Sequence, residues 1–337
     1  MRRCYFHIAP VEDFAMRKSW LLLNTLVLSC TLFFVACGAP GTALNPGNNS
    51  GPKTIKQIGL TVQAISNPFF VAIQQGAQAE AKKIGAQVFL DDANHDIGTQ
   101  SNQVDDFIQK HVDLILLNAV DSAGIAPAVT RAVQAHIPVI AIDVGAKGGV
   151  TATVESDNVQ AGQIACQFIA DRLKGQGNIA IADGPPVTSV QDRIKGCQSV
   201  LAKNPGLKVV ARQVGNGDKD TGLQIGTNIL TANPHLDAVF AINDQEGLGV
   251  MLAGQQAKRH NFFISAVDGS PDAVAALKAK GIFAATAAQS PYTMAEKAVQ
   301  VGEQVVAGQK LDSTLVTIPV TLITQENVNS YKGWLPK

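Results

Sequence analysis

Residues 56–91 read KQIGLTVQAISNPFFVAIQQGAQAEAKKIGAQVFLD, and this stretch decides the fold. Its apolar start at 56–62 is rich in Ile, Leu and Val, which is typical of a buried β-strand. Asn67 and the proline after it supply a helix cap and a first helical residue, so we predict a helix over 68–84. A second strand is expected at 87–91. A strand, a helix and a strand in this order predict a βαβ unit with parallel strands.

The same alternation continues to the end of the chain. Amphipathic segments such as 159–174 and 292–307 are predicted helices, and Ser270-Pro271 repeats the start signal seen at Asn67. Further strands are expected at 114–118, 138–143, 178–182, 208–213, 238–243, 264–268, 282–287 and 315–319. About ten strands and eight or nine helices fit two doubly wound lobes better than one. The predicted fold class is therefore α/β, with two doubly wound parallel-sheet lobes.

Composition and missing motifs narrow the function. The 337 residues are 46% hydrophobic and carry 27 basic and 27 acidic side chains, so the formal net charge is zero. That balance argues against a nucleic-acid binder and against a disordered chain. There is no glycine-rich phosphate loop and no G-x-S-x-G elbow, and the six histidines lack metal-ligand spacing. We expect a binding protein without cofactor or metal, and not an enzyme.

The N-terminus has the pattern of a secretory signal. Residues 20–36, WLLLNTLVLSCTLFFVA, carry no charge and follow Arg17 and Lys18. Acidic residues occur before Met16, where a signal peptide should be basic, so Met16 is the expected true start. We predict a signal peptide over 1–36.

A lipid anchor is expected directly after this segment. The run ends Phe34-Val-Ala-Cys37-Gly, which resembles the bacterial lipobox, with Phe34 in place of the usual Leu. Cys37 would then carry lipid, and 37–53, rich in Gly, Pro, Asn and Ser, would be a flexible tether. The alternative is an uncleaved membrane anchor, for which the apolar run is near the lower length limit.

Polar residues stand at the ends of five predicted strands. In open parallel sheets, ligands bind beyond the carboxyl ends of the strands. Asp and Asn also favour turns and helix caps after strands, so any single one carries little weight. Together they predict a polar cleft near Asp91, Asn118, Asp143, Asn243 and Asp268.

Residues 58–70, IGLTVQAISNPFF, are similar to the opening of the ribose-binding protein family. These are type I periplasmic sugar-binding proteins that serve ABC importers. Each matching motif is weak alone, but the ordered set across 54–320 is specific. The further matches are PVIAID at 138–143, SDN at 156–158, DRIKG at 192–196, AIND at 241–244, VDG at 267–269 and AATAAQ at 284–289.

The resemblance implies two lobes that close on a sugar about a three-segment hinge. The N-terminal lobe would comprise 54–155 plus 290–319, and the C-terminal lobe 156–289 plus 320–337. The expected crossings between the lobes lie near Glu155-Ser156, Gln289-Ser290 and Pro319-Val320.

The resemblance also implies the binding residues. Sugar hydroxyls both donate and accept hydrogen bonds, and charged partners make the stronger ones. Phe69 and Phe70 would form an aromatic wall, although core packing is the alternative for them. A surface salt bridge is the alternative for Arg193, and a turn or helix cap with Ser270 for Asp268. The residues assigned to hydroxyl recognition are Asn67, Asp143, Arg193, Asn243, Asp268 and Gln289.

The sequence departs from the ribose pattern at three positions. Val144 stands where ribose binders carry Arg, and Gly217 and Val267 mark places where the pattern expects Phe. Gln63 replaces a Ser, so its contact with ligand is doubtful. We therefore expect a wider pocket and a ligand other than ribose. Sugar phosphates are not expected, because Arg193 is the one cation among the assigned residues.

These observations predict an extracytoplasmic solute-binding lipoprotein. It would capture a neutral sugar or polyol between its lobes and deliver it to an ABC import permease. We expect a monomer that contacts the cell membrane only through the lipid on Cys37 and binds no nucleic acid. The alternative is a receptor for a sugar-like autoinducer, or a chemosensory binding protein of the same fold.

Two cysteines and one tryptophan remain outside the leader and the lipid site. Cys166 and Cys197 fall on predicted helices that flank the first strand of the C-terminal lobe. In an exported protein they form either a disulfide or two separate buried thiols. Trp20 lies in the leader and Trp334 in the tail, so we expect tryptophan fluorescence to report the cleft poorly.

Overall fold

The computed structural model describes residues 53–335. The predicted signal peptide 1–36, the lipid site Cys37 and all but the last residue of the tether 37–53 lie outside the described residues. Within 53–335, no helix combines the length and the apolar character needed to cross a membrane.

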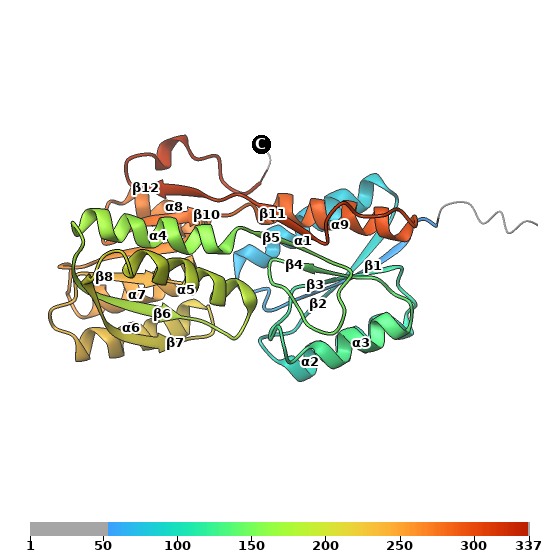
Figure 1. The fold of residues 1–337 in the computed structure, drawn as a ribbon, viewed down its shortest axis with the longest axis horizontal. Coiled ribbons are helices and arrows are strands. Elements are labelled where there is room, and N and C mark those ends of the chain that lie inside the picture. The colour runs from blue at the N-terminus through green and yellow to red at the C-terminus, as the bar shows by residue number, and fades with distance from the viewer. Residues whose placement is uncertain (1–52, 336–337) are drawn as a thin grey trace, which may run out of the picture. The chain divides into compact units, whose positions relative to one another are not determined.

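The first sheet has the strand order β11-β5-β4-β3-β1-β2, and every strand pair in it is parallel. Its strands are β1 (Gln57–Val62), β2 (Gln87–Asp92), β3 (Leu114–Leu117), β4 (Val139–Ile142), β5 (Ala152–Ser156) and β11 (Leu315–Ile318). Helices α1 (Pro68–Lys83) and α9 (Pro291–Val306) cover one face, and α2 (Ile97–Gln109) and α3 (Ala126–Gln134) the other (Figure 1).

The second sheet has the order β12-β10-β9-β8-β6-β7. Its strands are β6 (Gln176–Asp183), β7 (Gly206–Val214), β8 (Ala238–Ala241), β9 (Phe263–Asp268), β10 (Phe283–Ala288) and β12 (Thr321–Thr324). Helices α4 (Asn158–Arg172) and α5 (Thr188–Leu201) cover one face. The other face packs on α6 (Lys219–Ala232), α7 (Asp244–Gln256) and α8 (Pro271–Lys278), and the short helix η1 (Val328–Ser330) follows β12.

Burial on both faces explains the continuous apolar strands. In β3, Leu114 and Leu116 belong to the core under α1 and α9, whereas Ile115 and Leu117 belong to the core under α2 and α3. Successive side chains of a strand point to opposite faces, so a sheet covered twice needs apolar residues at every position. The expected fold class, α/β with two doubly wound sheets, is confirmed.

Each sheet with its helices is called a lobe below: the first lobe holds β1 to β5 and β11, and the second holds β6 to β10 and β12. All ten predicted strands occur, with ends within two residues of those expected, but β5 and β12 were missed. β12 runs antiparallel to β10, a departure from the parallel prediction. It follows β11 almost directly, so it enters the second sheet from the end where the other strands finish. The exact lobe boundaries expected from the sequence stay a prediction.

Helices α4 and α5 cross at two glycines. A methyl group on Gly162 would overlap the carbonyl oxygen of Arg193, and one on Gly196 would overlap that of Val159. Close beside this crossing, Cys166 and Cys197 form a disulfide with their Cα atoms 5.1 Å apart. The backbone at Arg193 is therefore fixed against α4 by packing and by a covalent link.

Candidate ligand-binding site

A cavity lies between the two lobes, at the carboxyl ends of their strands. It holds about 450 Å³ of empty space, part of it open to solvent. The cavity is lined by all eight residues assigned to ligand binding from the sequence: Asn67, Phe69, Phe70, Asp143, Arg193, Asn243, Asp268 and Gln289. The first four come from the first lobe and the last four from the second.

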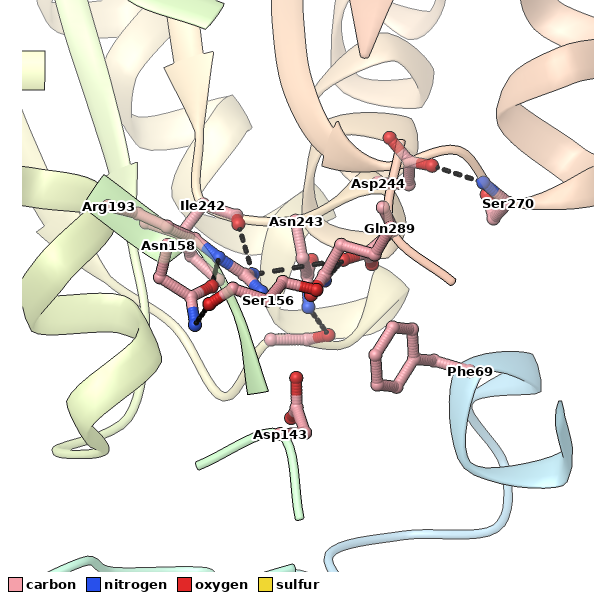
Figure 2. Close-up of polar contacts among 12 residues, drawn as sticks. Phe69, Asp143, Ser156, Asn158, Arg193, Ile242, Asn243, Asp244, Ser270 and Gln289 are labelled. Atoms are coloured by element: carbon pink, nitrogen blue, oxygen red, sulfur yellow. Dashed lines mark hydrogen bonds and ion pairs between the residues drawn. The ribbon is translucent and has the colours of Figure 1, made fainter. Parts of the chain in front are cut away.

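Arg193 of α5 is a buried cation, 4% exposed, so the surface salt bridge considered above is wrong. Its Nε donates to Oδ1 of Asn158 at 2.9 Å, and its Nη1 donates to the carbonyl oxygen of Ile242 at 2.8 Å (Figure 2). Nη1 also lies 3.7 Å from Oδ1 of Asp268. Within residues 53–335 these contacts leave Nη2 without a protein partner, so its N–H groups are available to a ligand.

Asp268 ends β9 and is 3% exposed. Nε2 of Gln289 donates to its Oδ1 at 2.7 Å, while Oε1 of Gln289 has no hydrogen-bond partner among the described residues. Burial raises the pKa of Asp268 well above its usual range, and the nearby Arg193 opposes that rise. Ser270, not Asp268, caps α8 by accepting from the N–H of Ala273. The Asp268 carboxyl is thus a cleft residue and not a helix cap.

Asp143 follows β4 with a left-handed backbone, φ 66°, a conformation that Asp tolerates better than most residues. It is 5% exposed, and its Oδ2 accepts a hydrogen bond from Nδ2 of Asn118 at 3.1 Å. Oδ1 has no partner among the described residues, and Figure 2 shows the side chain reaching up from the first lobe. Burial raises the pKa of Asp143 to about 6, with Arg193 opposing. An unpartnered buried acceptor is costly, which points to a donor supplied by a ligand.

Phe69 and Phe70 of α1 both line the cavity and both belong to the first lobe's core, so each of the two interpretations above holds in part. Their rings meet edge to face with centroids 5.6 Å apart. Asn67 caps α1: its Oδ1 accepts from the N–H of Phe69 at 2.9 Å. That bond uses the oxygen, so the amide nitrogen of Asn67 is the atom left for a ligand.

Asn243 is also a helix cap, since its Oδ1 accepts from the N–H of Glu246 at 2.9 Å. Its Nδ2 donates to the carbonyl oxygen of Gly217 at 2.7 Å. Gly217 lines the cavity, but Val144 and Val267 are fully buried in the core and do not. Of the three departures from the ribose pattern, only Gly217 therefore presents its own atoms to a ligand, whereas the side chains at 144 and 267 offer no contact.

Sequence reasoning missed several residues of the cavity wall. Gln63 lines it although its contact was doubted, and His95 lines it too. Ser189 and Asn216 complete the polar lining. His95 lies just beyond β2, at the same sheet edge as the strand-end residues, and that position is the signal that could have found it.

Trp334 corrects another expectation. It is 8% exposed, its ring centroid lies 5.6 Å from that of Phe69, and its Nε1 donates to the carbonyl oxygen of Asp268 at 2.8 Å. The tail is therefore not remote from the cleft, as the fluorescence expectation assumed, although the emission itself stays a prediction. The sequence could not show that the chain returns to the cleft after its last strand.

The lobes are closed on the cavity. Oγ1 of Thr188, in the second lobe, accepts from the N–H of Gly145 at 2.7 Å. The N–H of Thr188 donates to Oγ of Ser122 at 3.1 Å.

Among residues 53–335 there is no cluster of three or more His, Cys, Asp or Glu side chains suited to a metal ion. Carboxylates, amides, one guanidinium and an aromatic wall suit a compound with many hydroxyl groups. Fold and site together define a two-lobed binding protein for small polar solutes.

Comparison with known proteins identifies the family within this class. The family model described as periplasmic binding protein domain matches residues 58–310. The chain therefore belongs to the periplasmic sugar-binding protein family that includes the ribose-binding proteins of ABC importers, and the resemblance seen in the sequence is confirmed. This family is extracytoplasmic.

Individual relatives cover most of the chain. It is 34% identical to the ribose import binding protein of Bacillus subtilis, over 90% of this chain and 98% of the relative. It is 33% identical to the xylitol-binding protein of Mycolicibacterium smegmatis, over 88% of this chain and 83% of the relative. A solute-binding protein of Bacillus halodurans with bound myo-inositol superimposes with a TM-score of 0.77 at 29% identity, covering 84% of this chain and 99% of that one. These relatives are binding proteins and not enzymes, as expected from the sequence.

Proposed function

We propose that the protein captures a neutral sugar or polyol in the interlobe cavity and delivers it to an ABC import permease. The observation that carries this is a set of polar atoms, on buried side chains that line the cavity, without hydrogen-bond partners among residues 53–335. Asp143 Oδ1 and Gln289 Oε1 are acceptors, and Arg193 Nη2 is a donor. A polyhydroxy compound supplies both kinds of partner from one small molecule.

The charge of the cavity favours a neutral ligand. Arg193 is the one Arg or Lys side chain that lines it in residues 53–335, and Asp143 and Asp268 line it as well. The guanidinium already faces the carboxyl group of Asp268. A phosphate or carboxylate ligand would meet these two acidic groups with no further Arg or Lys side chain in the lining to offset them, and like charges repel strongly in a buried site.

We propose further that ribose is not the best ligand. The second Arg of the ribose pattern is absent, because Val144 stands in its place and lies in the core. Losing such a donor costs about 1.5–3 kcal/mol, or roughly 10- to 150-fold in affinity. Relatives named for ribose and xylitol, and a neighbour solved with myo-inositol, define the panel of compounds to compare.

The remaining proposals concern location and assembly. The protein is proposed to be an exported monomer, made with a signal peptide over 1–36 and held at the membrane by lipid on Cys37 through the tether 37–53. Replacing Cys37 with Ser should release it from the membrane fraction. A signal-receptor role is not favoured, because the relatives named above are import or solute-binding proteins.

Thermal melting of the full chain with ribose, xylitol, myo-inositol and a wider set of pentoses and hexoses tests the binding function. A ligand at 100 times its Kd adds about 2.7 kcal/mol of stability, which raises Tm by several degrees. Asp268→Asn should abolish the shift, whereas Val214→Ala, at an exposed position of β7, should retain it. A flat response to every neutral sugar and polyol would contradict the assignment.

A further inference from the structure

The tail after η1 returns to the binding site and contacts two successive backbone carbonyls. Nε1 of Trp334 donates to the carbonyl oxygen of Asp268 at 2.8 Å. The hydroxyl of Tyr331 donates to the carbonyl oxygen of Gly269 at 3.2 Å. Asp268 carries one of the carboxyl groups that line the cavity, so the tail holds the backbone from which that side chain extends.

This backbone needs outside support. Asp268 has φ 138° and Gly269 has φ 75°, in the region that side chains other than glycine rarely adopt. On the other side of the loop, the N–H of Gly269 donates to Oγ1 of Thr286 at 3.0 Å and that of Ser270 to Oδ2 of Asp244 at 2.7 Å. These side chains satisfy the amide groups. The Asp268 carbonyl accepts from the N–H of Gln289 at 2.9 Å as well as from Trp334, so the tail adds a second hydrogen bond there and supplies the one at Gly269. An unusual backbone conformation persists only where its surroundings fix it in this way.

The same tryptophan reaches the other lobe. Its ring meets that of Phe69 edge to face, with the ring planes at 90° and centroids 5.6 Å apart. Trp334 is counted in the first lobe's core, together with Phe69 and Phe70. Four of the eight assigned site residues belong to each lobe. Within residues 53–335, no hydrogen bond directly joins one of the first lobe's four to one of the second lobe's four. Trp334 thus contacts one assigned residue of each lobe.

We propose that Trp334 is a positioning residue that couples closure of the lobes to the placement of Asp268 and Phe69 around the ligand. This role rests on the proposed function, because it acts on the same cavity. When the lobes separate, Trp334 must leave either the Asp268 carbonyl or the Phe69 ring, since one side chain cannot follow both. The closed state is therefore favoured by contacts that the open state lacks, and the environment of the indole changes with closure.

Fluorescence of the full chain carrying Trp20→Phe gives the first test, because Trp334 is then its only tryptophan. Ribose, xylitol and myo-inositol are the probes. We expect whichever of them binds by calorimetry to change the emission of Trp334, with the same Kd. Unchanged emission at saturation would overturn the proposal.

Substitutions separate the two contacts. Trp334→Phe keeps a ring against Phe69 but removes the N–H, and should weaken binding about 2- to 10-fold, the usual range for one lost hydrogen bond. Trp334→Leu removes both contacts and should weaken it more, and Tyr331→Phe should give a loss like that of Trp334→Phe. The control is Leu335→Ala in the same tail, where the side chain is 48% exposed. Wild-type affinity in Trp334→Phe and Tyr331→Phe would contradict the role.

Small-angle scattering without ligand tests the coupling independently of the proposed function. Trp334→Leu should increase the radius of gyration relative to Leu335→Ala, because loss of the tail contacts favours the open state. An equal radius in the two variants would overturn the proposal. If no neutral sugar or polyol of the wider panel binds the wild-type chain, the proposed function fails, and the scattering result alone decides the role of Trp334.

Discussion

Arg193 and Asp268 form an ion pair inside the closed cleft, with Nη1 3.7 Å from Oδ1 and both side chains 5% exposed. A buried charge is tolerated when it is paired and hydrogen-bonded, and Arg193 is also held by Asn158 and the Ile242 carbonyl. Removing one partner leaves the other charge uncompensated, which is why breaking a buried pair costs far more than the pair itself contributes.

Arg193→Gln should lower the free energy of unfolding by about 3–5 kcal/mol and abolish detectable ligand binding. The double variant Arg193→Gln with Asp268→Asn should recover part of the stability but not the binding. Chemical denaturation and calorimetry on both chains check this. Equal stability losses in the single and double variants would show that the pair is not coupled.

Asp143→Asn should weaken ligand binding at least tenfold while leaving stability equal or higher. The carboxyl group is buried, its Oδ1 is unpartnered among the described residues, and burial raises its pKa to about 6. A neutral amide removes the cost of that charge but is a weaker acceptor for ligand hydroxyls. Calorimetry and thermal melting separate the two effects, and an unchanged Kd would remove Asp143 from the binding set.

Stability without ligand should fall as pH rises from about 4.5 to 7.5. Burial raises the pKa of Glu155 from 4.5 to about 7, the nearby carboxyl groups of Asp143 and Asp192 add to this, and Arg193 opposes it. Burial also raises the pKa of Asp143 from 3.8 to about 6. The folded state then binds more protons than the unfolded state. Its extra stability is therefore fully present at a pH below the pKa values of the unfolded state, and it is lost as the pH rises through the pKa values of the folded state. Melting at several pH values in this range measures the trend, and Tm should depend less on pH in Glu155→Gln. A Tm that rises with pH in this window would contradict the predicted direction.

Ligand affinity should show the opposite trend. If ionised Asp143 accepts from a hydroxyl, protonation below pH 6 removes the charged acceptor and the Kd should increase. Calorimetric titrations at pH 5 and pH 7.5 check this, with Asp143→Asn as the control that should lose most of the dependence.

Gly162→Ala should lower both stability and affinity, although Gly162 does not line the cavity. A methyl group there overlaps the carbonyl oxygen of Arg193, so α5 must shift and carry the guanidinium with it. Overpacking of this kind typically costs about 1–3 kcal/mol. The matched control is Gly281→Ala, where a methyl group has nothing within 4 Å. Calorimetry of both variants measures the difference, and equal affinities would mean that α5 adjusts without moving Arg193.

Loss of the disulfide should act on stability more than on binding. Cys166 and Cys197 are 31 residues apart, and closing a loop of this length contributes about 3–4 kcal/mol in the chain-entropy model. The double change to Ser should lower the denaturation midpoint accordingly, while the glycine crossing keeps Arg193 in place. Thiol titration of the unfolded, unreduced protein should find neither cysteine free. Two free thiols would mean that the bond does not form.

Local patterns predicted the strands and much of the cleft because their physical causes are local. Asn67 and Ser270 cap helices through hydrogen bonds from residues two and three positions ahead. Partners this close in the chain can be recognised from the sequence alone. Strand-end polar residues meet because parallel strands finish at one edge. Two of the five predicted strand-end residues do not line the cavity. Asn118 donates a hydrogen bond to Asp143, and Asp91 lies outside the lining.

The features that were missed depend on the tertiary path of the chain. β5 and β12 each carry only two apolar residues, so neither shows the apolar run that marks the other strands, and the direction of β12 follows from which lobe the chain enters. Trp334 contacts residues more than 60 positions away, Asp268 among them, and no local pattern reveals such a partner. His95 and Asn216 line the cavity from loops, where sequence constraints are weakest.

The two halves of the cavity differ in how firmly they are built. In the second lobe, Arg193, Asn243 and Gln289 are each fixed by hydrogen bonds within that lobe, and the α4–α5 crossing fixes the backbone beneath Arg193. In the first lobe, Asp143 receives one hydrogen bond, from Asn118, and Phe69 and Phe70 are held by packing in the core. We therefore expect a ligand to dock on the second lobe first, so that this surface sets the association rate constant. The lifetime of the complex would then depend on how often the first lobe separates from the ligand, so that substitutions in the first lobe change affinity mainly through the dissociation rate constant.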